Sequence, residues 1–378
     1  MAPTEILARQ HYENLAPLFA RFGLPCALLT GSTPARERRA ILAGLQSGDI
    51  TLCIGTHALL TADVQYARLG LVITDEQHRF GVEQRSALSH KSAAPHTLVL
   101  SATPIPRTLA LIIYGDLDVS VIDELPPGRQ PIRTVHYTDA ARLRLFGFMR
   151  QEIKKGRQIY VVYPLIKESE TMDYKDLQDG YEAISRDFPL PEYVTTICHG
   201  KMKPEDKEES MRQFKSGEAN IMVATSVIEV GVDVPNATVM VIESAERFGL
   251  SQLHQLRGRV GRGSQQSYCI LMSGEKLSKE ARLRLEAMCE TNDGFRLAEL
   301  DLKLRGAGDV NGTLQSGMAF DLKIANPTLD SQILTVTREA AAEVLTADPT
   351  LTQNGHEGLR ELRKRYSGRE EIDFSQIS

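Results

Sequence analysis

Short apolar runs, separated by stretches with helical spacing, organise the first third of the chain. The runs cover residues 26–29, 52–54, 70–74 and 97–100. Between the first two runs, residues 34–45 have the spacing of a helix, for which Ser32 or Thr33 can serve as the N-cap. Buried strands that alternate with helices are typical of a mostly parallel sheet, and such a sheet carries its functional loops at the carboxyl ends of the strands.

A proline-rich break follows this first α/β region. Residues 124–131 contain three prolines and one glycine, which predicts a linker. Further apolar runs come after it, at residues 133–137, 158–163, 193–197, 219–224, 237–242 and 268–272. Helices are predicted for residues 140–154 and 203–216, so this part of the chain is expected to form a second α/β domain.

The pattern changes again in the last quarter of the chain. Apolar residues recur at helical spacing on two successive segments, at Ala281, Leu285 and Met288 and then at Phe295, Ala298 and Leu302. With Ser278 as an N-cap, these segments predict a helical hairpin. A glycine-rich loop at 305–317 and helices at 330–346 and 355–366 follow. We therefore expect three units, residues 1–128, 129–274 and 275–378.

Composition narrows the class of protein. Hydrophobic residues make up 42% and charged residues 25% of the 378 residues, as in soluble globular proteins. No apolar run approaches the roughly 20 residues of a membrane span, and the first residues lack the apolar core of a signal peptide. Five scattered cysteines without a CxxC pair favour reduced thiols in the cytoplasm over a zinc site. The net charge of −5 argues against a uniformly basic surface but allows a local basic groove.

Two acids end one of the apolar strands. Asp75 and Glu76 follow the run at 70–74. Nucleotide hydrolysis needs an acid near Mg²⁺ and a group that orients the attacking water, which Asp75 and Glu76 could supply respectively. A solvated strand end is the alternative. Ser101 and Thr103 follow the next strand, where small hydroxyl groups can bond such acids; an ordinary turn before Pro104 is the alternative there.

An arginine-rich segment lies near the end of the second α/β domain. Charge on a transferring phosphate requires arginines at fixed positions, and Arg259 and Arg262 lie three residues apart, so on a short helix they would share a face. A basic surface turn is the alternative. Glycines at 258, 261 and 263 favour close backbone packing over a long helix.

Together these segments resemble the superfamily-2 helicases. The matches are DEQH at 75–78, SAT at 101–103, ATSVIEVGVDVP from residue 224 and QxxGRxxR at 255–262. The resemblance implies two RecA-like parallel-sheet lobes, the first incomplete, with ATP and Mg²⁺ between them and a helical hairpin and C-terminal helices behind. Asp75, Glu76, Gln255, Arg259 and Arg262 match the catalytic positions, with Asp75 on Mg²⁺. The positions implied to contact the nucleotide are His78, Ser101, Thr103, Gly231 and Asp233.

A narrower resemblance is to RecG and to the transcription-repair coupling factor. It rests on APTEILA at 2–8, GTHALL at 55–60, RFGVEQR at 79–85, ATPIPRT at 102–108 and the loop RGAGDVNGTLQSG at 305–317. Ala307 replaces a proline usual in RecG and Leu314 replaces a common basic residue, so the loop alone does not separate the two. Gly312-Thr313 and FDLKIA at 320–325 look more like RecG.

The RecG resemblance implies an ATP-driven motor on branched DNA, such as stalled forks and Holliday junctions. The same resemblance implies a monomer, with a single-stranded DNA-binding protein as a further partner. Loop residues that match DNA-contacting positions are Thr4, Gly31, Thr56, His199 and Thr225. For His199 a structural role is an equal alternative. Arg305 and Gln315 match positions that couple ATP hydrolysis to movement. The alternatives are a coupling-factor motor that pushes RNA polymerase and a DNA-binding remnant without enzymatic activity.

The sequence contains no GxxxxGK[ST] phosphate loop. Its one Gly-Lys pair, Gly200-Lys201, is followed by Met202. In the families above, this loop and the wedge domain of RecG lie upstream of the position of Ala2, so we expect the chain to start after both. Such a chain lacks backbone N–H groups and a lysine for the phosphates. We expect it to hydrolyse ATP poorly by itself and to leave apolar surface of the first lobe uncovered.

Overall fold

The computed structural model describes residues 1–76, 80, 88, 91–92, 95–102, 118–164, 170–225, 234–305 and 331–367. The first lobe comprises α1 (Glu5–Ala20), β1 (Cys26–Leu29), α2 (Ala35–Ser47), β2 (Leu52–Gly55), the 3₁₀ helix η1 (His57–Leu60), β3 (Leu71–Thr74) and β4 (His96–Val99). β1 pairs with β2 and β3 pairs with β4, both in parallel. The four predicted strands are therefore confirmed to within one residue at each end.

The first two residues lie between the two strand pairs of the first lobe. The amino group of Met1 donates to the carbonyl of Ile73 (2.6 Å), and the Met1 carbonyl accepts from the N–H of Asp75 (3.0 Å). The N–H of Ala2 donates to the carbonyl of Gly55 (2.8 Å). Met1 and Ala2 thus bond to β2 on one side and to β3 on the other, as a strand between them would.

The loop before α2 differs from the expectation. Neither Ser32 nor Thr33 caps α2, which begins after Pro34 without a side-chain cap. The Thr33 hydroxyl instead accepts from the N–H of Thr30 (2.9 Å), and the Ser32 hydroxyl donates to the Glu5 carboxylate (2.8 Å). Both hydroxyl groups therefore bond to their own loop or to α1, and the predicted cap was wrong.

The second lobe is one six-stranded parallel sheet of order β5-β10-β9-β6-β8-β7. Its strands are β5 (Arg133–Thr138), β6 (Gln158–Tyr163), β7 (Thr195–Cys198), β8 (Ile221–Thr225), β9 (Ala237–Ile242) and β10 (Tyr268–Ser273). Its helices are η3 (Asp139–Ala141), α5 (Arg142–Lys154), α6 (Glu170–Asp187), α7 (Pro204–Lys215), η6 (Ala245–Arg247) and α8 (Leu250–Arg257). All six predicted strands exist, and the predicted linker at 124–131 contains no helix or strand.

Helices cover both faces of this sheet. On one face, Met149 of α5 and Ile184 of α6 pack against the sheet, and on the other face Phe214 of α7 and Leu253 of α8 do so. All residues of β8 and β9 are buried as a result. This double coverage explains why the strands appear in the sequence as continuous apolar runs and not as alternating patterns.

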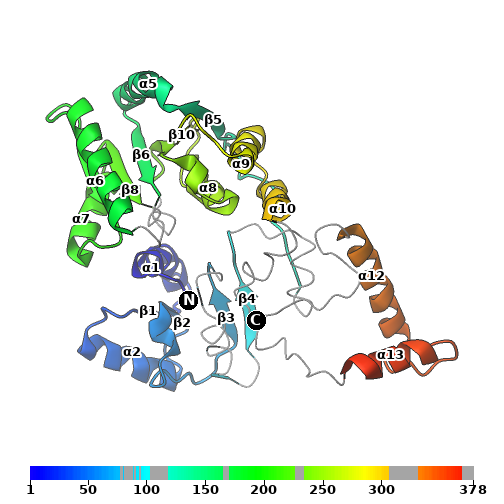
Figure 1. Cartoon of the computed structure of the whole chain (residues 1–378). Coiled ribbons are helices and arrows are strands. Elements are labelled where there is room, and N and C mark those ends of the chain that lie inside the picture. Colours follow the sequence, from blue (N-terminus) through cyan, green and yellow to red (C-terminus); the bar gives the residue numbers. More distant parts are fainter. Residues whose placement is uncertain are drawn as a thin grey trace.

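The predicted helical hairpin exists, and it packs against the second lobe. It consists of α9 (Lys279–Glu290) and α10 (Gly294–Arg305). The Ser278 hydroxyl caps α9 by accepting from the N–H of Ala281 (3.1 Å). Of the predicted face, Ala298 is buried, whereas Phe295 and Leu302 are only half-buried; Leu297 is the most buried of the described side chains of α10. Two further helices of the described residues, α12 (Ser331–Ala347) and α13 (Glu357–Ser367), lie apart from the strands of the two lobes (Figure 1).

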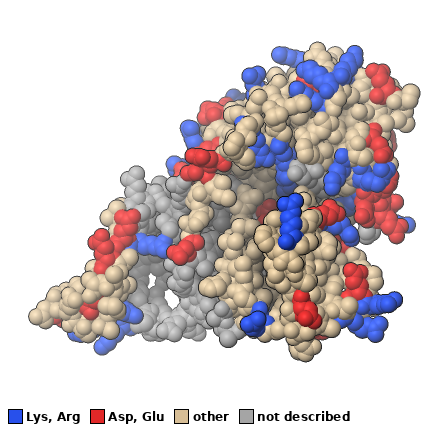
Figure 2. Space-filling view, turned by 180° about the vertical axis from the view of Figure 1, so that it is seen from behind, with Lys and Arg blue, Asp and Glu red and all other residues tan. Residues whose placement is uncertain are grey.

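The surface of the described residues combines mixed charge with one apolar area. Figure 2 shows Lys and Arg interspersed with Asp and Glu over the face in view. On β3 and β4, Leu71, Ile73 and Leu98 are 55%, 40% and 47% exposed. This matches the expectation that apolar surface of the first lobe stays uncovered. Among the helices of the described residues, none is long and apolar enough to cross a membrane.

A candidate nucleotide site between the lobes

A cavity of about 290 Å³ lies between the two lobes. The first lobe contributes α1 and the segments after β3 and β4, and the second lobe contributes α8 and the turn after it. The lining residues are Leu7, Gln10, Asp75, Glu76, Ala102, His254, Gln255, Gly258, Arg259 and Arg262. The cavity therefore brings together all five residues that match catalytic positions, although they come from two separate sheets.

The acidic wall of the cavity is at the carboxyl end of β3. The Asp75 carboxylate accepts a hydrogen bond from Nε2 of His11 on α1 (2.9 Å), and this bond holds the pKa of Asp75 below its usual value. Glu76 adopts a left-handed backbone conformation with φ of 52°. Such a conformation is strained for a residue other than glycine, and strained residues of this kind concentrate at functional sites. The strand end thus places two acidic residues at the cavity, with Asp75 oriented by His11.

The basic wall follows α8 instead of lying on it. The helix ends at Arg257, so Arg259 and Arg262 lie in the turn beyond, and the predicted helical face for them was wrong. Gly261 in this turn has a φ of 80°, and a Cβ there would come within 2.9 Å of the Ile132 side chain. The left-handed Gly261 shapes the turn between the two arginines. Both Arg259 and Arg262 line the cavity from this turn.

Two residues of α8 that the sequence did not indicate support this wall. The Arg257 side chain is only 2% exposed, and its guanidinium donates to the carbonyls of Met288 (2.9 Å) and Thr291 (2.8 Å) at the end of α9. It also donates to Nδ1 of His254 (2.9 Å). Burial, aided by the Arg257 charge, lowers the pKa of His254 to about 4, so this cavity-lining imidazole is neutral at neutral pH. Arg257 therefore fixes α8 to the hairpin.

The other implied nucleotide and coupling residues are only partly described. His78, Thr103, Gly231, Asp233 and Gln315 lie outside the described residues. Ser101 is exposed and directly precedes the cavity residue Ala102. Arg305 is the last residue of α10, and its side chain is not among those described.

The residues that match DNA-contacting positions lie at the ends of parallel strands. Gly31 follows β1, Thr56 follows β2, His199 follows β7 and Thr225 ends β8, while Thr4 caps α1 by accepting from the N–H of Leu7 (3.3 Å). Burial, together with Lys201 and Lys207, lowers the pKa of His199.

Two of these threonines are buried. Thr56 and Thr225 are 1% and 0% exposed, and their hydroxyl groups have no hydrogen-bond partner among the described residues. A phosphate would therefore meet the backbone at these two positions unless the loops rearrange.

The side chains of the cavity fit part of a magnesium–nucleotide complex. Mg²⁺ is commonly held by one or two carboxylates together with substrate phosphates, and Asp75 offers such a carboxylate. Arg259 and Arg262 face it from the opposite lobe, where phosphate oxygens would lie. The lysine and the backbone N–H cradle of a phosphate loop are not part of this sequence. The donor set therefore fits the metal and the outer phosphate, and it does not include the usual cradle.

Comparison with known proteins places these features in one family. The DEAD/DEAH box helicase family matches residues 1–112, and the helicase conserved C-terminal domain matches residues 142–264. Domain 3, C-terminal, of ATP-dependent DNA helicase RecG matches residues 291–378. The RecG helicase of Synechocystis is 51% identical over 367 residues, which are 97% of this chain and 44% of that protein. The chain is a homologue of the RecG helicases of superfamily 2.

The RecG relatives are longer proteins than this chain. The RecG helicase of Bacillus subtilis is 48% identical over 348 residues, which cover 92% of this chain and 51% of that protein. The chain thus spans about half the length of the relatives it matches. The names of these relatives favour RecG over the transcription-repair coupling factor. The glycine-rich loop alone did not separate these two families.

Solved structures confirm the predicted fold class. A structure of RecG bound to a three-way DNA junction matches with a TM-score of 0.69 and 46% identity, covering 88% of this chain and 43% of that one. A leucine-to-valine variant of S. cerevisiae Dbp5 bound to RNA and ADP BeF3 matches with a TM-score of 0.56 at 15% identity, covering 81% of this chain and 80% of that one, and it supports the fold alone. RecA-like parallel lobes followed by C-terminal helices are therefore the architecture of this RecG homologue.

Proposed function

We propose that this chain forms the motor of an ATP-dependent DNA helicase that acts on branched DNA in recombination and repair. The observation that carries the proposal is the cavity in which carboxylates of one lobe face arginines of the other. Phosphoryl transfer needs this pairing, because a metal ligand and cationic groups must lie on opposite sides of the transferred phosphate. The named RecG relatives and the RecG–junction structure support ATP and branched DNA as the ligands.

Each cavity residue has a proposed role. Bound Mg·ATP would supply the phosphoryl group whose transfer to water drives movement. Asp75 would hold the metal, and Glu76 would orient the attacking water and take up its proton. Arg259 and Arg262 would neutralise charge on the phosphate oxygens, and Gln255 would add a polar contact on the same wall. For nucleotide contact we also propose His78, Ser101, Thr103, Gly231 and Asp233.

DNA contacts are proposed along the carboxyl ends of the strands. Thr4, Gly31, Thr56, His199 and Thr225 meet the sugar-phosphate backbone there, so sequence preference should be weak. We keep residues 1–128, 129–274 and 275–378 as the proposed units.

The proposed partners and compartment follow from this role. Branched DNA is the substrate, a single-stranded DNA-binding protein is a further partner, and the protein acts as a monomer. All five cysteines are free thiols, which supports the cytoplasm as the compartment.

An ATPase comparison tests the proposal. This chain should hydrolyse ATP poorly with forked DNA, because its sequence lacks the phosphate loop. A chimera with the upstream half of the Synechocystis relative should turn over ATP, and Arg262→Ala in it should lower kcat by about 10³-fold. Arg36→Ala, an exposed change on α2, is the control. Normal kcat with lost DNA affinity in Arg262→Ala would make the arginine turn a DNA-binding patch instead.

Coupling is tested in the same chimera. We propose that Arg305 and Gln315 connect lobe closure to the DNA track, as a two-state rearrangement can. Gln315→Ala should preserve ATP hydrolysis on forked DNA and reduce the number of base pairs unwound per ATP. An unchanged ratio would remove Gln315 from the motor.

A further inference from the structure

Helix α1 is bonded at its first turn to the loop after β1. The Glu5 carboxylate accepts from the N–H of Ser32 (3.0 Å) and from its hydroxyl (2.8 Å). The neighbouring Gly31 lies so close that a Cβ there would be 3.3 Å from Oε1 of Glu5. Thr4 caps the same turn. Two residues proposed to contact DNA, Thr4 and Gly31, are thus directly linked to the start of one helix.

Two turns farther along, the same helix contacts the metal-binding acid. His11 follows Thr4 by seven residues, a rise of about 10 Å along the helix axis. Its Nε2 lies 2.9 Å from Oδ2 of Asp75. An ionised carboxylate only accepts hydrogen bonds, so the imidazole N–H is the donor. Leu7 and Gln10 of the same helix line the nucleotide cavity.

The helix between these contacts is held as a unit. Ala8, between Glu5 and His11, is 0% exposed and packs with Ala2 and Ile54 against β2. A displacement of Thr4, or of the loop that contains Gly31, therefore moves His11 with it. The helical turns between Glu5 and His11 are closed by backbone hydrogen bonds and packed on the sheet. Figure 1 shows α1 on the side of β1 and β2 that faces the second lobe.

We propose that His11 is a positioning residue through which α1 conveys DNA contact at Thr4 and Gly31 to the orientation of the Asp75 carboxylate. The inference rests on the proposed function, since it takes Asp75 as the Mg²⁺ ligand and takes Thr4 and Gly31 as DNA contacts. It goes beyond that function by assigning DNA stimulation of ATP hydrolysis to one helix of the first lobe. His11 acts through Asp75 and does not touch the reacting atoms.

The first experiment uses this chain with ¹⁵N-labelled histidine at constant pH. Forked DNA should shift the ring-nitrogen signals of His11, which are assigned by their loss in His11→Gln. In Glu5→Ala, which cuts the bonds to Ser32, the His11 shift should disappear while His199 still responds to DNA. An equal His11 shift in Glu5→Ala would overturn the relay and leave the proposed function intact. If no histidine responds to DNA, the DNA-binding proposal fails and the relay fails with it.

The second experiment measures DNA stimulation in the chimera, as the ratio of kcat with forked DNA to kcat without it. His11→Ala should lower this ratio about ten-fold, which is the effect of losing one hydrogen bond to a charged group. His11→Gln retains an N–H donor and should restore most of the ratio. Asn14→Ala, an exposed change on the same helix, is the control. A reduced kcat with an unchanged ratio in His11→Ala would show a merely structural role and overturn the proposal.

Discussion

Both lobes carry residues of the nucleotide site near the carboxyl ends of parallel strands, but the strands of the two lobes differ in pairing and burial. The second lobe is a continuous sheet of six strands with helices packed on both faces, and its strands β8 and β9 are entirely buried. The described part of the first lobe has two separate strand pairs, between which Met1 and Ala2 form backbone hydrogen bonds near the carboxyl ends. Leu71 and Ile73 of β3 remain largely exposed. The arginine wall of the nucleotide site therefore rests on a sheet that is buried on both faces. The acidic wall rests on strands with exposed apolar side chains.

This difference in packing indicates which wall of the nucleotide site is held more firmly. In the second lobe, the turn with Arg259 and Arg262 follows a helix that Arg257 fixes to the hairpin. In the first lobe, Asp75 is held by one hydrogen bond from His11 and by backbone contact with Met1. We expect the arginine wall to keep its geometry under conditions in which the acidic wall loosens, because local stability follows local packing.

The largest contrast should come from matched phenylalanine truncations. Phe214 is 0% exposed and packs its ring 4.7 Å from that of Tyr160, so Phe214→Ala should destabilise the second lobe by about 3–5 kcal/mol. Phe22 of the first lobe is 73% exposed, and Phe22→Ala should change stability by no more than about 0.5 kcal/mol. Hydrogen exchange during urea unfolding reads each lobe separately. Equal losses in the two variants would contradict the contrast.

The second contrast concerns the attachment of α8 to the hairpin. Arg257→Met should cost about 2–4 kcal/mol, because the carbonyls of Met288 and Thr291 lose their donor inside the protein. Exchange protection should fall in α9 first. Arg36→Met, on the exposed side of α2, should be neutral. Unchanged protection of α9 would show that packing alone holds the hairpin.

The third contrast places the same isoleucine-to-threonine substitution on an exposed strand, β3, and on a buried strand, β9. Ile73→Thr on β3 should alter stability by no more than about 0.5 kcal/mol and raise solubility, because it removes exposed apolar surface. Ile242→Thr on β9, where the side chain is 0% exposed, should cost at least about 2 kcal/mol. Denaturation midpoints and static light scattering measure the two effects. A large loss in Ile73→Thr would mean that this face has a partner in solution.

Patterning predicted the strands because buried parallel strands require continuous apolar runs. The run at 158–163 coincides with β6. It did not predict α6 or α8, since α6 is dominated by polar residues and α8 has only eight. The apolar face of α10 was predicted only in part: Ala298 is buried, but Leu297 is more deeply buried than Phe295 or Leu302. Burial there depends on how the hairpin meets α8 and not on periodicity alone.

The two walls of the site were predictable as motifs but not as geometry. Asp75, Glu76, Arg259 and Arg262 stood out in the sequence, and the neighbouring glycines argued against a long helix. The sequence did not show that α8 would end at Arg257, before both arginines. His11 lies 64 residues from Asp75 along the chain. Only its spacing from Leu7, one helical turn, could have placed it on the same side of α1. Arg257 was missed because a buried arginine is identified by the carbonyls it meets, which belong to another helix.

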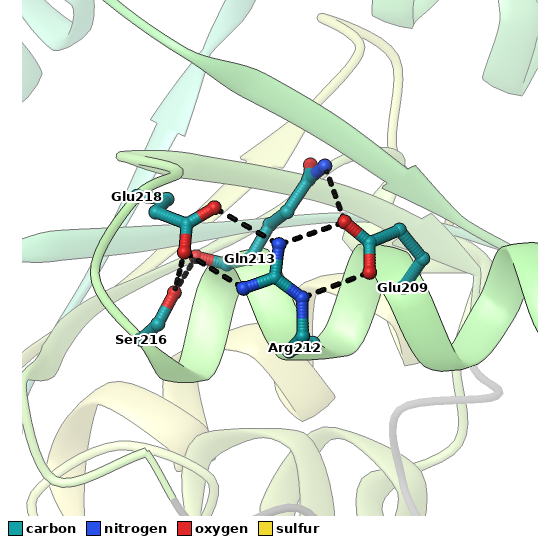
Figure 3. Close-up of polar contacts among 5 residues, drawn as sticks. All are labelled: Glu209, Arg212, Gln213, Ser216 and Glu218. Atoms are coloured by element: carbon teal, nitrogen blue, oxygen red, sulfur yellow. Dashed lines mark hydrogen bonds and ion pairs between the residues drawn. The ribbon is translucent and has the colours of Figure 1, made fainter.

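The smallest effect is expected at the turn between α7 and β8, where an ion-pair network lies on the surface of the otherwise closed second lobe. Arg212 bonds to both Glu209 and Glu218, and Ser216 donates to Glu218 (Figure 3). The bonds from Arg212 lower the pKa of Glu209 from 4.5 to about 2. A depressed folded pKa contributes stability above the ordinary value of 4.5, and this contribution is lost as the pH falls toward 2.

Arg212→Met should therefore reduce the loss of thermal stability between about pH 6 and about pH 3. The effect should be small, because exposed ion pairs are screened by water and salt. It should shrink further in high salt, which distinguishes charge from packing. Arg282→Met, on the exposed side of α9, should keep the acid sensitivity of the unmodified chain. If the acid sensitivity of Arg212→Met at low ionic strength equals that of the unmodified chain, the ion pairs of Arg212 add nothing to the stability of the second lobe.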